Sequence, residues 1–463
     1  MSGTGPAATP GRLVRYTLLA VTVLGTMCNN IINVPLRSIA HDLDASVASS
    51  VLCVSAFVLT LAVAMPLVGW LGDRFGQKQT LVLSLLLMLA AQAAAALVTN
   101  LGQLIVLRGV QGLACAAIPP MVMGLLGGFY PHQLTRAMGA WAAANGIGQA
   151  VGPPVGGLIS DWAGWRFIFV IIAVACAVVV TLVWRFVPSR PTRATALHMP
   201  GAILLTTGMG MLLVATTAVS QPGTPIWLVG VVALSGVASL VGYGVVSRGR
   251  ATAMIPVRLI VESRFLRSSL AAFAQMFTLG TVLVALPLYF TGPLDLSTSR
   301  AGLIFFTLPA IMAVAAPVVG RLAEWTSPRI VLRSGLGVII GGAAVTGVIA
   351  ANESGHTTTV LLVVMMVVLG AGMAMVQTPA AAGATRSPAG QYGAALGLFS
   401  MLRFSGSTAA AAWVALTYPH GWFLVLFLGC SLVGLLGLVT SFFGPDPVPH
   451  TPIVAEDAVV TNA

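Results

Sequence analysis

The residues with the clearest capacity for specific chemistry lie in one short polar stretch between two apolar runs, residues 47–68 and 79–99. The carboxylate of Asp73 is suited to accept hydrogen bonds from a helix N-terminus, where unpaired backbone N–H groups carry partial positive charge. Gly72 and Gly76 permit a tight turn and a close approach of the backbone. We therefore predict a turn that makes a specific polar contact. Its residues are Gly69, Gly72, Asp73, Arg74, Gly76 and Lys78.

A second pattern places small residues four positions apart in the apolar run 136–159. Residues at this spacing share one helix face, and small side chains there let two helix backbones touch. Two prolines in the same run bend the helix. The pattern predicts close packing that shapes this helix, with generic packing of glycines as the alternative. Its residues are Gly148, Gly152, Pro153, Pro154, Gly156 and Gly157.

Polar residues inside apolar runs form a third group. Arg108 is the one charge that we place inside the hydrocarbon, and Gln111 follows three positions later. Because an ion in hydrocarbon costs several kcal/mol, Arg108 is either functional or extends to a nearby surface. Asn29 and Asn33 are four apart and share a helix face. That face either lines a central cavity or makes hydrogen bonds between helices.

Reactive clusters are not evident in the sequence. The 6 histidines are scattered over loops and run ends, and the 5 cysteines lie in apolar runs without metal-ligand spacing. There is no Walker A sequence to hold ATP. We therefore predict that the chain is not an enzyme and that it holds no metal and no cofactor.

The elements that position these residues follow from composition. Hydrophobic residues make up 57% of the 463 positions and charged residues only 7%, which indicates an integral membrane protein. A bilayer core requires about 20 apolar residues per helix. Fourteen such runs can be counted, and they are 16–36, 47–69, 79–99, 102–126, 136–159, 165–187, 198–219, 225–246, 267–290, 300–320, 329–350, 357–380, 391–415 and 421–443.

The cations set the predicted orientation. If the N-terminus is cytoplasmic, the 22 lysines and arginines fall on the cytoplasmic side, with four exceptions. The positive-inside rule then favours fourteen spans with both termini in the cytoplasm. The cations lie in short loops rather than on a soluble face, so nucleic acid is not an expected partner. Arg403 is placed near the cytoplasmic end of 391–415, as an anchor or a gating residue. The exceptions are Arg37, Arg166 and Arg300 outside and Arg108 in the membrane.

A weak internal repeat predicts the domain organisation. The sequence from Gly320 to Glu324, followed by Arg329, resembles the stretch around Asp73, and each copy follows the second span of a six-span half. Two parallel halves would be related by an axis along the membrane normal. The predicted units are residues 1–190 and 251–443 for the halves, 191–250 for an inserted helix pair, and 444–463 for a disordered cytoplasmic tail.

Three motifs carry a family resemblance. The stretch at Asp73 matches G-x-L-x-D-R-x-G-x-K, Arg108 begins R-x-x-Q-G, and Gly148 begins G-x-x-x-G-P-x-x-G-G. Together they resemble the fourteen-span drug:proton antiporter family of the major facilitator superfamily. The resemblance implies an all-α membrane fold and Asp73 in a cytoplasmic gate, with Glu324 in a degraded copy. It also implies the antiporter motif in the fifth span and Arg108 with Gln111 in the cavity or in coupling.

The function implied by the resemblance is secondary active export of small amphipathic organic compounds. Transport would proceed by alternating access in the cell membrane, by a protein that we expect to be a monomer. The partners would be the substrate, protons and the lipid bilayer.

One departure complicates proton coupling. The first span resembles the family motif L-D-x-T-I-V-N-V-A-L-P, but the position of its carboxylate is occupied by Cys28. Each of the 11 acidic residues falls in a loop or at a span end. A span-end acid could face the cavity, with Asp42 and Asp161 as candidates, or a histidine could titrate instead. The remaining alternative is no proton coupling.

Without proton coupling, the chain would be an uncoupled or potential-driven facilitator. Moving one charge through the membrane field is worth about 2.3 kcal/mol per 100 mV, so an inside-negative potential favours export of anions over cations. A cavity with Arg108, asparagines and no carboxylate suits an anionic or neutral compound. On this hypothesis, Arg108→Gln impairs the transport of anions most.

Overall fold

The computed structural model describes residues 11–192, 198–219, 223–250, 253–352 and 355–444, and within these ranges it is helical without strands. The first part contains α1 (Arg12–Asn30), α2 (Leu36–Asp42), α3 (Val47–Phe75), α4 (Gln77–Ala95), α5 (Leu101–Cys115), α6 (Ile118–Phe129), α7 (Leu134–Ala163) and α8 (Arg166–Phe186). Next come α9 (Met199–Val219), α10 (Ile226–Ser247) and α11 (Val257–Ile260). The last part contains α12 (Ser263–Thr291), α13 (Thr298–Trp325), α14 (Pro328–Asn352), α15 (His356–Arg386), α16 (Gly393–Thr417) and α17 (Phe423–Thr440).

Eleven helical segments of the described chain are long and apolar enough to cross a membrane, with α5 and α6 counted together. The predicted all-helical membrane architecture is therefore confirmed. Three other long helices, α1, α7 and α16, coincide with predicted runs. They carry the polar side chains Asn29, Asn145 and Arg403, which lower their hydropathy. The count of fourteen spans stays a prediction.

The structure differs from two predicted runs, and proline explains both differences. The run 16–36 is helical only to Asn30, because Pro35 cannot donate a backbone hydrogen bond and restricts the residue before it. The run 102–126 is interrupted between α5 and α6, just before Pro119 and Pro120. These two residues have no N–H for the carbonyl groups one turn earlier, so the helix bends there.

The predicted turn around Asp73 is much shorter than expected. Residues 69–75 continue α3, and α4 begins at Gln77, so the connection is Gly76 alone. Gly76 has a φ of 102°, a conformation that residues with a Cβ atom rarely adopt. Asp73 therefore sits on the last turn of a helix, which fixes the direction of its side chain.

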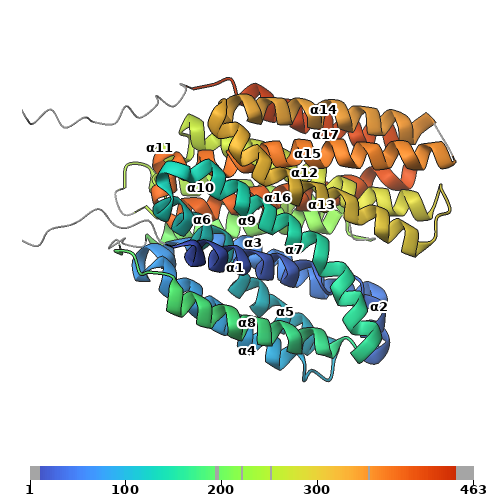
Figure 1. The fold of residues 1–463 in the computed structure, drawn as a ribbon, viewed down its shortest axis with the longest axis horizontal. Coiled ribbons are helices and arrows are strands. Elements are labelled where there is room, and N and C mark those ends of the chain that lie inside the picture. Colours follow the sequence, from blue (N-terminus) through green and yellow to red (C-terminus); the bar gives the residue numbers. More distant parts are fainter. Residues whose placement is uncertain (1–10, 193–197, 220–222, 251–252, 353–354, 445–463) are drawn as a thin grey trace, which may run out of the picture.

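Two groups of helices meet along two long contacts. Figure 1 shows α1–α8, coloured blue to green, on one side and α12–α17, coloured yellow to red, on the other. We call them the first and second groups. They meet where α3 packs against α16 and where α7 packs against α13, and we call these contacts together the seam. The division into two transport domains stays a proposal.

The two ends of this bundle are chemically distinct. At the Asp73 end, α3 and α13 finish while α7 and α16 begin. The last residues of α17 lie there as well, since Arg329 Nε donates to the carbonyl of Ser441 at 2.8 Å. At the opposite end, which we call the Asp42 end, α2 lies beside the start of α8. The predicted tail lies outside the described residues, apart from Gly444.

Helices α9 and α10 form an antiparallel pair at the edge of the seam. They pack closely against each other, with Gly208 on α9 facing Gly236 on α10. Helix α9 also packs against α3 and against α16, and therefore touches both groups. The predicted inserted pair thus lies beside the place where the two groups meet.

Candidate functional site

Asp73 joins the two helix groups at the Asp73 end of the bundle. The backbone N–H of Gly393 donates to Asp73 Oδ1 at 2.7 Å, and that of Ala394 donates to Oδ2 at 3.3 Å. Both donors belong to the first turn of α16, whose N–H groups have no acceptor within their own helix. The carboxylate is 8% exposed, so solvent screens this contact weakly. The contact has the geometry predicted from sequence, while its role in gating stays a proposal.

Glycines let the backbones of α3 and α16 touch beside this carboxylate. A Cβ atom at Gly69 would lie 2.2 Å from the carbonyl oxygen of Gly393, and one at Gly397 would lie 2.2 Å from that of Met65. Gly72 instead faces Met121 on α6, whose flexible side chain is the nearest group. Gly69 and Gly397 are therefore required for the closed seam, because backbone atoms cannot move aside as a side chain can.

A second polar contact crosses between the groups nearby. Arg136 on α7 pairs with Glu324 on α13 at 2.8 Å, and both side chains are partly exposed. Exposed pairs of this kind contribute about 0–1 kcal/mol. Lys78 contacts its own group, donating to the carbonyl of Trp184 on α8 at 2.8 Å, while the Arg74 guanidinium lies 5.7 Å from the ring centroid of Trp70. Asp73 is thus the principal polar contact across the seam at this end.

The glycine pattern of α7 packs against α1. Cβ atoms at Gly148 and Gly156 would lie 2.7 Å and 2.0 Å from the carbonyl oxygens of Val23 and Ile31, respectively. Gly152, between them, has more room, with its nearest neighbours at 3.6 Å. The helix continues through Pro153 and Pro154. This close packing lies within the first group, so it determines the position of α1 relative to α7.

We expect Gly156→Ala to weaken α1–α7 packing strongly and Gly152→Ala to be tolerated. The first change places a methyl group 2.0 Å from a backbone oxygen, and the second places it at ordinary van der Waals distance. Thermal unfolding of the two purified variants in detergent measures the difference. Equal melting temperatures would contradict the close packing.

Arg108 is enclosed within the first group and is 1% exposed. It donates to the carbonyls of Cys53 and Cys28 at 3.4 and 3.2 Å and to Gln111 Oε1 at 2.9 Å, while its Nη2 has no partner. Its guanidinium lies 4.1 Å from the ring centroid of Phe57, close enough for a cation–π interaction. Arg108 is therefore held by neutral acceptors and a ring, and one of these acceptors belongs to Cys28, which occupies the position of the family's carboxylate.

Arg403 corrects the prediction that one arginine lies in the membrane interior. It sits in the middle of α16, is 2% exposed, and lies between the rings of Trp141 and Phe404 at centroid distances of 5.0 and 4.9 Å. Its Nε and Nη1 atoms have no hydrogen-bond partner among the described residues. Each unpaired buried donor costs about 1–3 kcal/mol, more when charged. Arg403 therefore lies well inside α16 rather than near the end of the predicted run.

A small central cavity lies beside Arg403. Its volume is about 30 Å³, enough for one or two water molecules but far below the roughly 300–1,000 Å³ of typical ligand pockets. Asn29 is among its lining residues, which agrees with the alternative that this asparagine faces a central cavity. Asn33 is exposed and does not line it. The lining residues come from α1, α3, α5, α6, α7 and α16 and are Thr22, Gly25, Thr26, Asn29, Leu61, Cys115, Ile118, Pro119, Trp141, Asn145 and Phe404.

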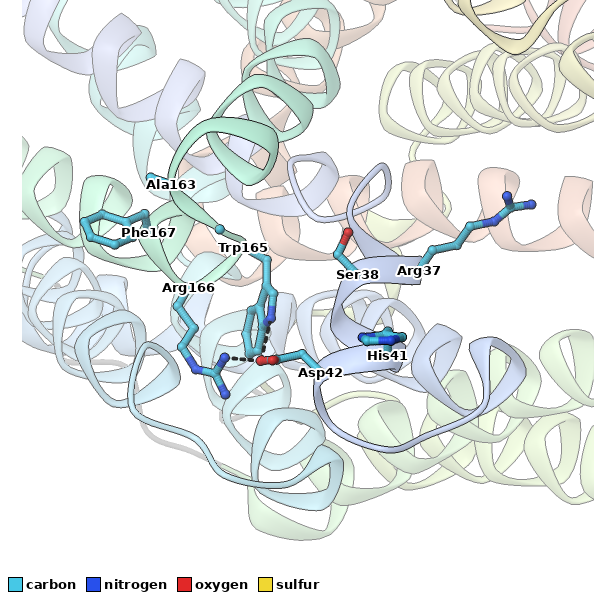
Figure 2. Close-up of a pocket in the computed structure, with 9 residues that line it drawn as sticks. Arg37, Ser38, His41, Asp42, Ala163, Trp165, Arg166 and Phe167 are labelled. Carbon is cyan, nitrogen blue, oxygen red and sulfur yellow. Dashed lines mark hydrogen bonds and ion pairs between the residues drawn. The ribbon is translucent and has the colours of Figure 1, made fainter.

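The candidate proton carriers lie far from this cavity. Figure 2 shows Asp42 at the Asp42 end with Trp165 and Arg166 pointing towards it, and Arg37 pointing away. Trp165 Nε1 donates to Asp42 Oδ2 at 3.1 Å, and Arg166 forms an ion pair with the same oxygen. The surrounding cleft of about 690 Å³ is lined by residues of α2, α7, α8 and their connections, so it lies within the first group.

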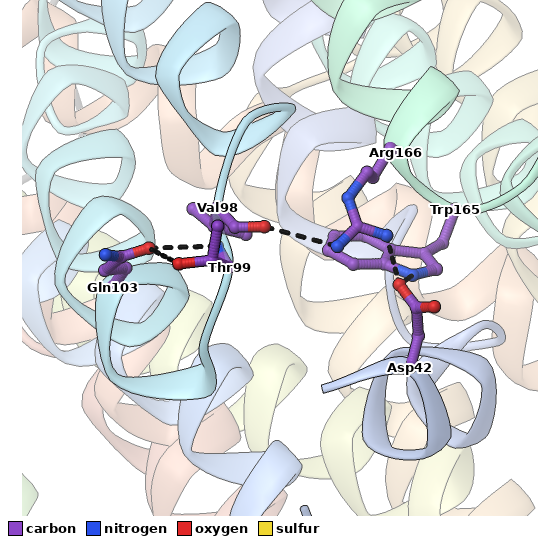
Figure 3. A network of polar contacts seen from close by, with 6 residues as sticks. All are labelled: Asp42, Val98, Thr99, Gln103, Trp165 and Arg166. Atoms are coloured by element: carbon purple, nitrogen blue, oxygen red, sulfur yellow. Dashed lines mark hydrogen bonds and ion pairs between the residues drawn. The ribbon is translucent and has the colours of Figure 1, made fainter. Parts of the chain in front are cut away.

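The polar network around Asp42 keeps this carboxylate charged. The Arg166 guanidinium, followed by the Trp165 indole N–H, holds the pKa of the Asp42 carboxyl below its usual range. Arg166 also donates to the carbonyl of Val98 at 3.2 Å, which ties α8 to the loop before α5 (Figure 3). Asp161, the other candidate, is exposed on the last turn of α7. Neither acid lines the central cavity in this conformation.

Known proteins resemble this chain over most of its length. The chain is 26% identical over 412 residues to the uncharacterized transporter YebQ of Escherichia coli (strain K12), covering 87% of this chain and 89% of YebQ. It is 26% identical to the drug efflux pump JefA of Mycobacterium tuberculosis, covering 94% and 83%. For the methylenomycin A resistance protein of Streptomyces coelicolor the identity is 27%, covering 74% and 72%.

A solved structure and a family pattern complete the comparison. The crystal structure of the human organic anion transporter MFSD10 (TETRAN) superposes with a TM-score of 0.70 at 15% identity, covering 93% of this chain and 99% of that one. At this identity the likeness shows a shared fold alone. The pattern of the Major Facilitator Superfamily matches residues 18–411 and 268–461. The chain is therefore a multi-pass membrane transporter, not an enzyme, and belongs to the Major Facilitator Superfamily.

Proposed function

We propose that this protein is a secondary active exporter of small amphipathic organic compounds, working by alternating access as a monomer in the cell membrane. The contact of Asp73 with the first turn of α16 is the observation that carries the proposal, because it closes one end of the seam through a few breakable interactions. Relatives named as a drug efflux pump and a resistance protein support export as the direction.

The Asp73 end is the cytoplasmic side in this proposal, and all fourteen helical segments cross the membrane. Most of the described cations lie at the Asp73 end, and the positive-inside rule assigns such an end to the cytoplasm. The described cations at the Asp42 end are Arg37, Arg166 and Arg300. Both chain termini are then cytoplasmic.

The structure then represents a state closed to the cytoplasm. The central cavity of about 30 Å³ is too small for an organic compound, so binding requires the two groups to move apart. Opening the Asp73 end would separate Asp73 from Gly393 and Arg136 from Glu324. The two groups would move as the two six-helix halves around the cavity.

Two driving forces for transport are candidates. Proton antiport follows from the family resemblance, but Asp42 is ion-paired and the interior of the described chain holds Arg108 and Arg403 without a carboxylate. These observations favour the second candidate, a potential-driven facilitator of an anionic compound or an uncoupled facilitator of a neutral one. Purified protein in liposomes separates the two: flux under a pH gradient with proton counterflow means antiport, and flux under a potential alone means facilitation. No flux under either gradient would refute transport.

Cys28→Asp tests which residue decides the coupling. The backbone carbonyl of Cys28 accepts from Arg108 Nη1 at 3.2 Å, so a carboxylate at this position would lie near a buried cation. It would also introduce an acid that can titrate in the interior. We expect the variant to show proton counterflow in the liposome assay that the parent protein lacks. Cys176→Asp places an acid elsewhere in the same group and serves as control. Equal proton movement in parent and variant would contradict the prediction.

A further inference from the structure

Arg403 lies at mid-membrane depth beside the central cavity. It follows Gly393, the first residue of α16, by ten positions, which corresponds to about 15 Å along the helix. The hydrocarbon core is about 30 Å thick, so this guanidinium is near its centre. Residues of the cavity wall flank it, since Trp141 and Phe404 both line the cavity and both lie within 5.0 Å of the guanidinium carbon, measured to their ring centroids.

The polar groups around Arg403 lack acceptors. The Nε and Nη1 atoms of Arg403 and the Nε1 atom of Trp141 are buried without a hydrogen-bond partner in the described chain. All three are N–H donors, and Arg403 adds a full positive charge. The aromatic rings offset part of that charge but accept no conventional hydrogen bond. The site therefore offers donors and charge to something that is itself negative.

The two buried arginines differ in this respect. Arg108 has three acceptors within the first group, and neither arginine is itself among the residues that line the cavity. Arg403 has none, comes from the second group, and meets Trp141 from the first group across the seam. An anion between Arg403 and Trp141 would thus contact both groups.

We propose that the central site binds an amphipathic organic anion, a carboxylate or sulfonate, whose acidic group is held by Arg403 and the Trp141 indole N–H. Its apolar body would lie against Leu61, Ile118 and Phe404, and Asn29 and Asn145 supply further polar contacts. The proposal rests on the transport function proposed above and specifies its substrate class. The inside-negative potential drives export of such an anion, so no interior carboxylate is needed for uphill movement.

The test compares two probes of the same shape, 2-naphthoate and its neutral amide, 2-naphthamide. Isothermal titration of the purified full chain should show naphthoate binding about tenfold or more tightly than naphthamide, as for charge-paired ligands. Arg403→Gln should remove that preference, and Arg403→Lys should retain part of it, because lysine keeps the charge without the planar donor pair. Arg300→Gln removes an exposed arginine at the Asp42 end and should change neither affinity.

Two results would overturn the anion site. One is equal binding of both probes, or no binding of naphthoate, by the parent protein, which requires no variant and is independent of any folding defect. The other is an Arg403→Gln variant that keeps the preference for naphthoate. A parent protein that moves a neutral compound in liposomes but shows no preference for the carboxylate would refute the anion site and leave the transport function standing.

Discussion

Asp73→Asn is expected to reduce transport in liposomes by about tenfold or more while the protein still folds. Asparagine keeps the shape of the side chain but loses the charge and one of the two acceptor oxygens that receive the Gly393 and Ala394 N–H groups. Charge-assisted hydrogen bonds of this kind contribute about 1.5–3 kcal/mol, enough to shift a two-state equilibrium roughly tenfold to a hundredfold. The variant should therefore spend most of its time open at the Asp73 end.

Hydrogen exchange measures the same change directly, because the Gly393 amide is itself one of the donors. In the parent protein this amide should exchange slowly, and in Asp73→Asn it should exchange at a rate near that of an exposed amide. Glu324→Gln breaks the partly exposed pair with Arg136 and provides the matched comparison, with a smaller effect expected on both readouts. Slow exchange at Gly393 in Asp73→Asn would show that the carboxylate does not hold the seam.

Gly397→Ala is expected to reduce transport strongly by preventing closure. The added methyl group would lie 2.2 Å from the carbonyl oxygen of Met65 and 2.8 Å from the Cα atom of Pro66, so α3 and α16 would have to separate. Because both neighbours are backbone atoms, no change of rotamer relieves the clash. We expect flux to fall by about tenfold or more, with the variant trapped open at the Asp73 end.

Gly341→Ala on α14 is the matched control, because a Cβ atom there meets nothing within 4 Å. It should keep transport within about twofold of the parent and gain slightly in helix propensity. Hydrogen exchange along residues 393–397 separates a trapped transporter from an unfolded one, since a trapped protein loses protection at the seam alone. Normal flux in Gly397→Ala would mean that the seam does not need this close contact.

Much of this architecture is readable in the sequence because hydrocarbon imposes simple rules on it. Apolar runs predict the helices, and a carboxylate next to glycines at the end of one run predicts a contact with a helix N-terminus. The bend between α5 and α6 was also readable, since Pro119 and Pro120 are adjacent within one run. Arg403 was instead predicted near one end of the run 391–415, although its position in the sequence is close to the middle of that run.

What the sequence cannot supply is the pairing between distant segments. Nothing local indicates that Arg403 meets Trp141, or that Arg108 finds the carbonyls of Cys28 and Cys53, because these contacts depend on how whole helices pack. The same limit applies to Asp42. A carboxylate can transfer protons, but only the packing of α2 beside α8 shows that Asp42 already forms an ion pair with Arg166.

The position of α9 carries a kinematic consequence. A rigid rod in contact with two bodies that rotate against each other can stay fixed to at most one of them. Since α9 touches both α3 and α16, the proposed opening of the seam would slide α9 along at least one of these helices. In the proposed cycle, the helix pair α9–α10 would move with one helix group while the other group slides along it, so the resistance at this sliding contact would contribute to the rate of transport.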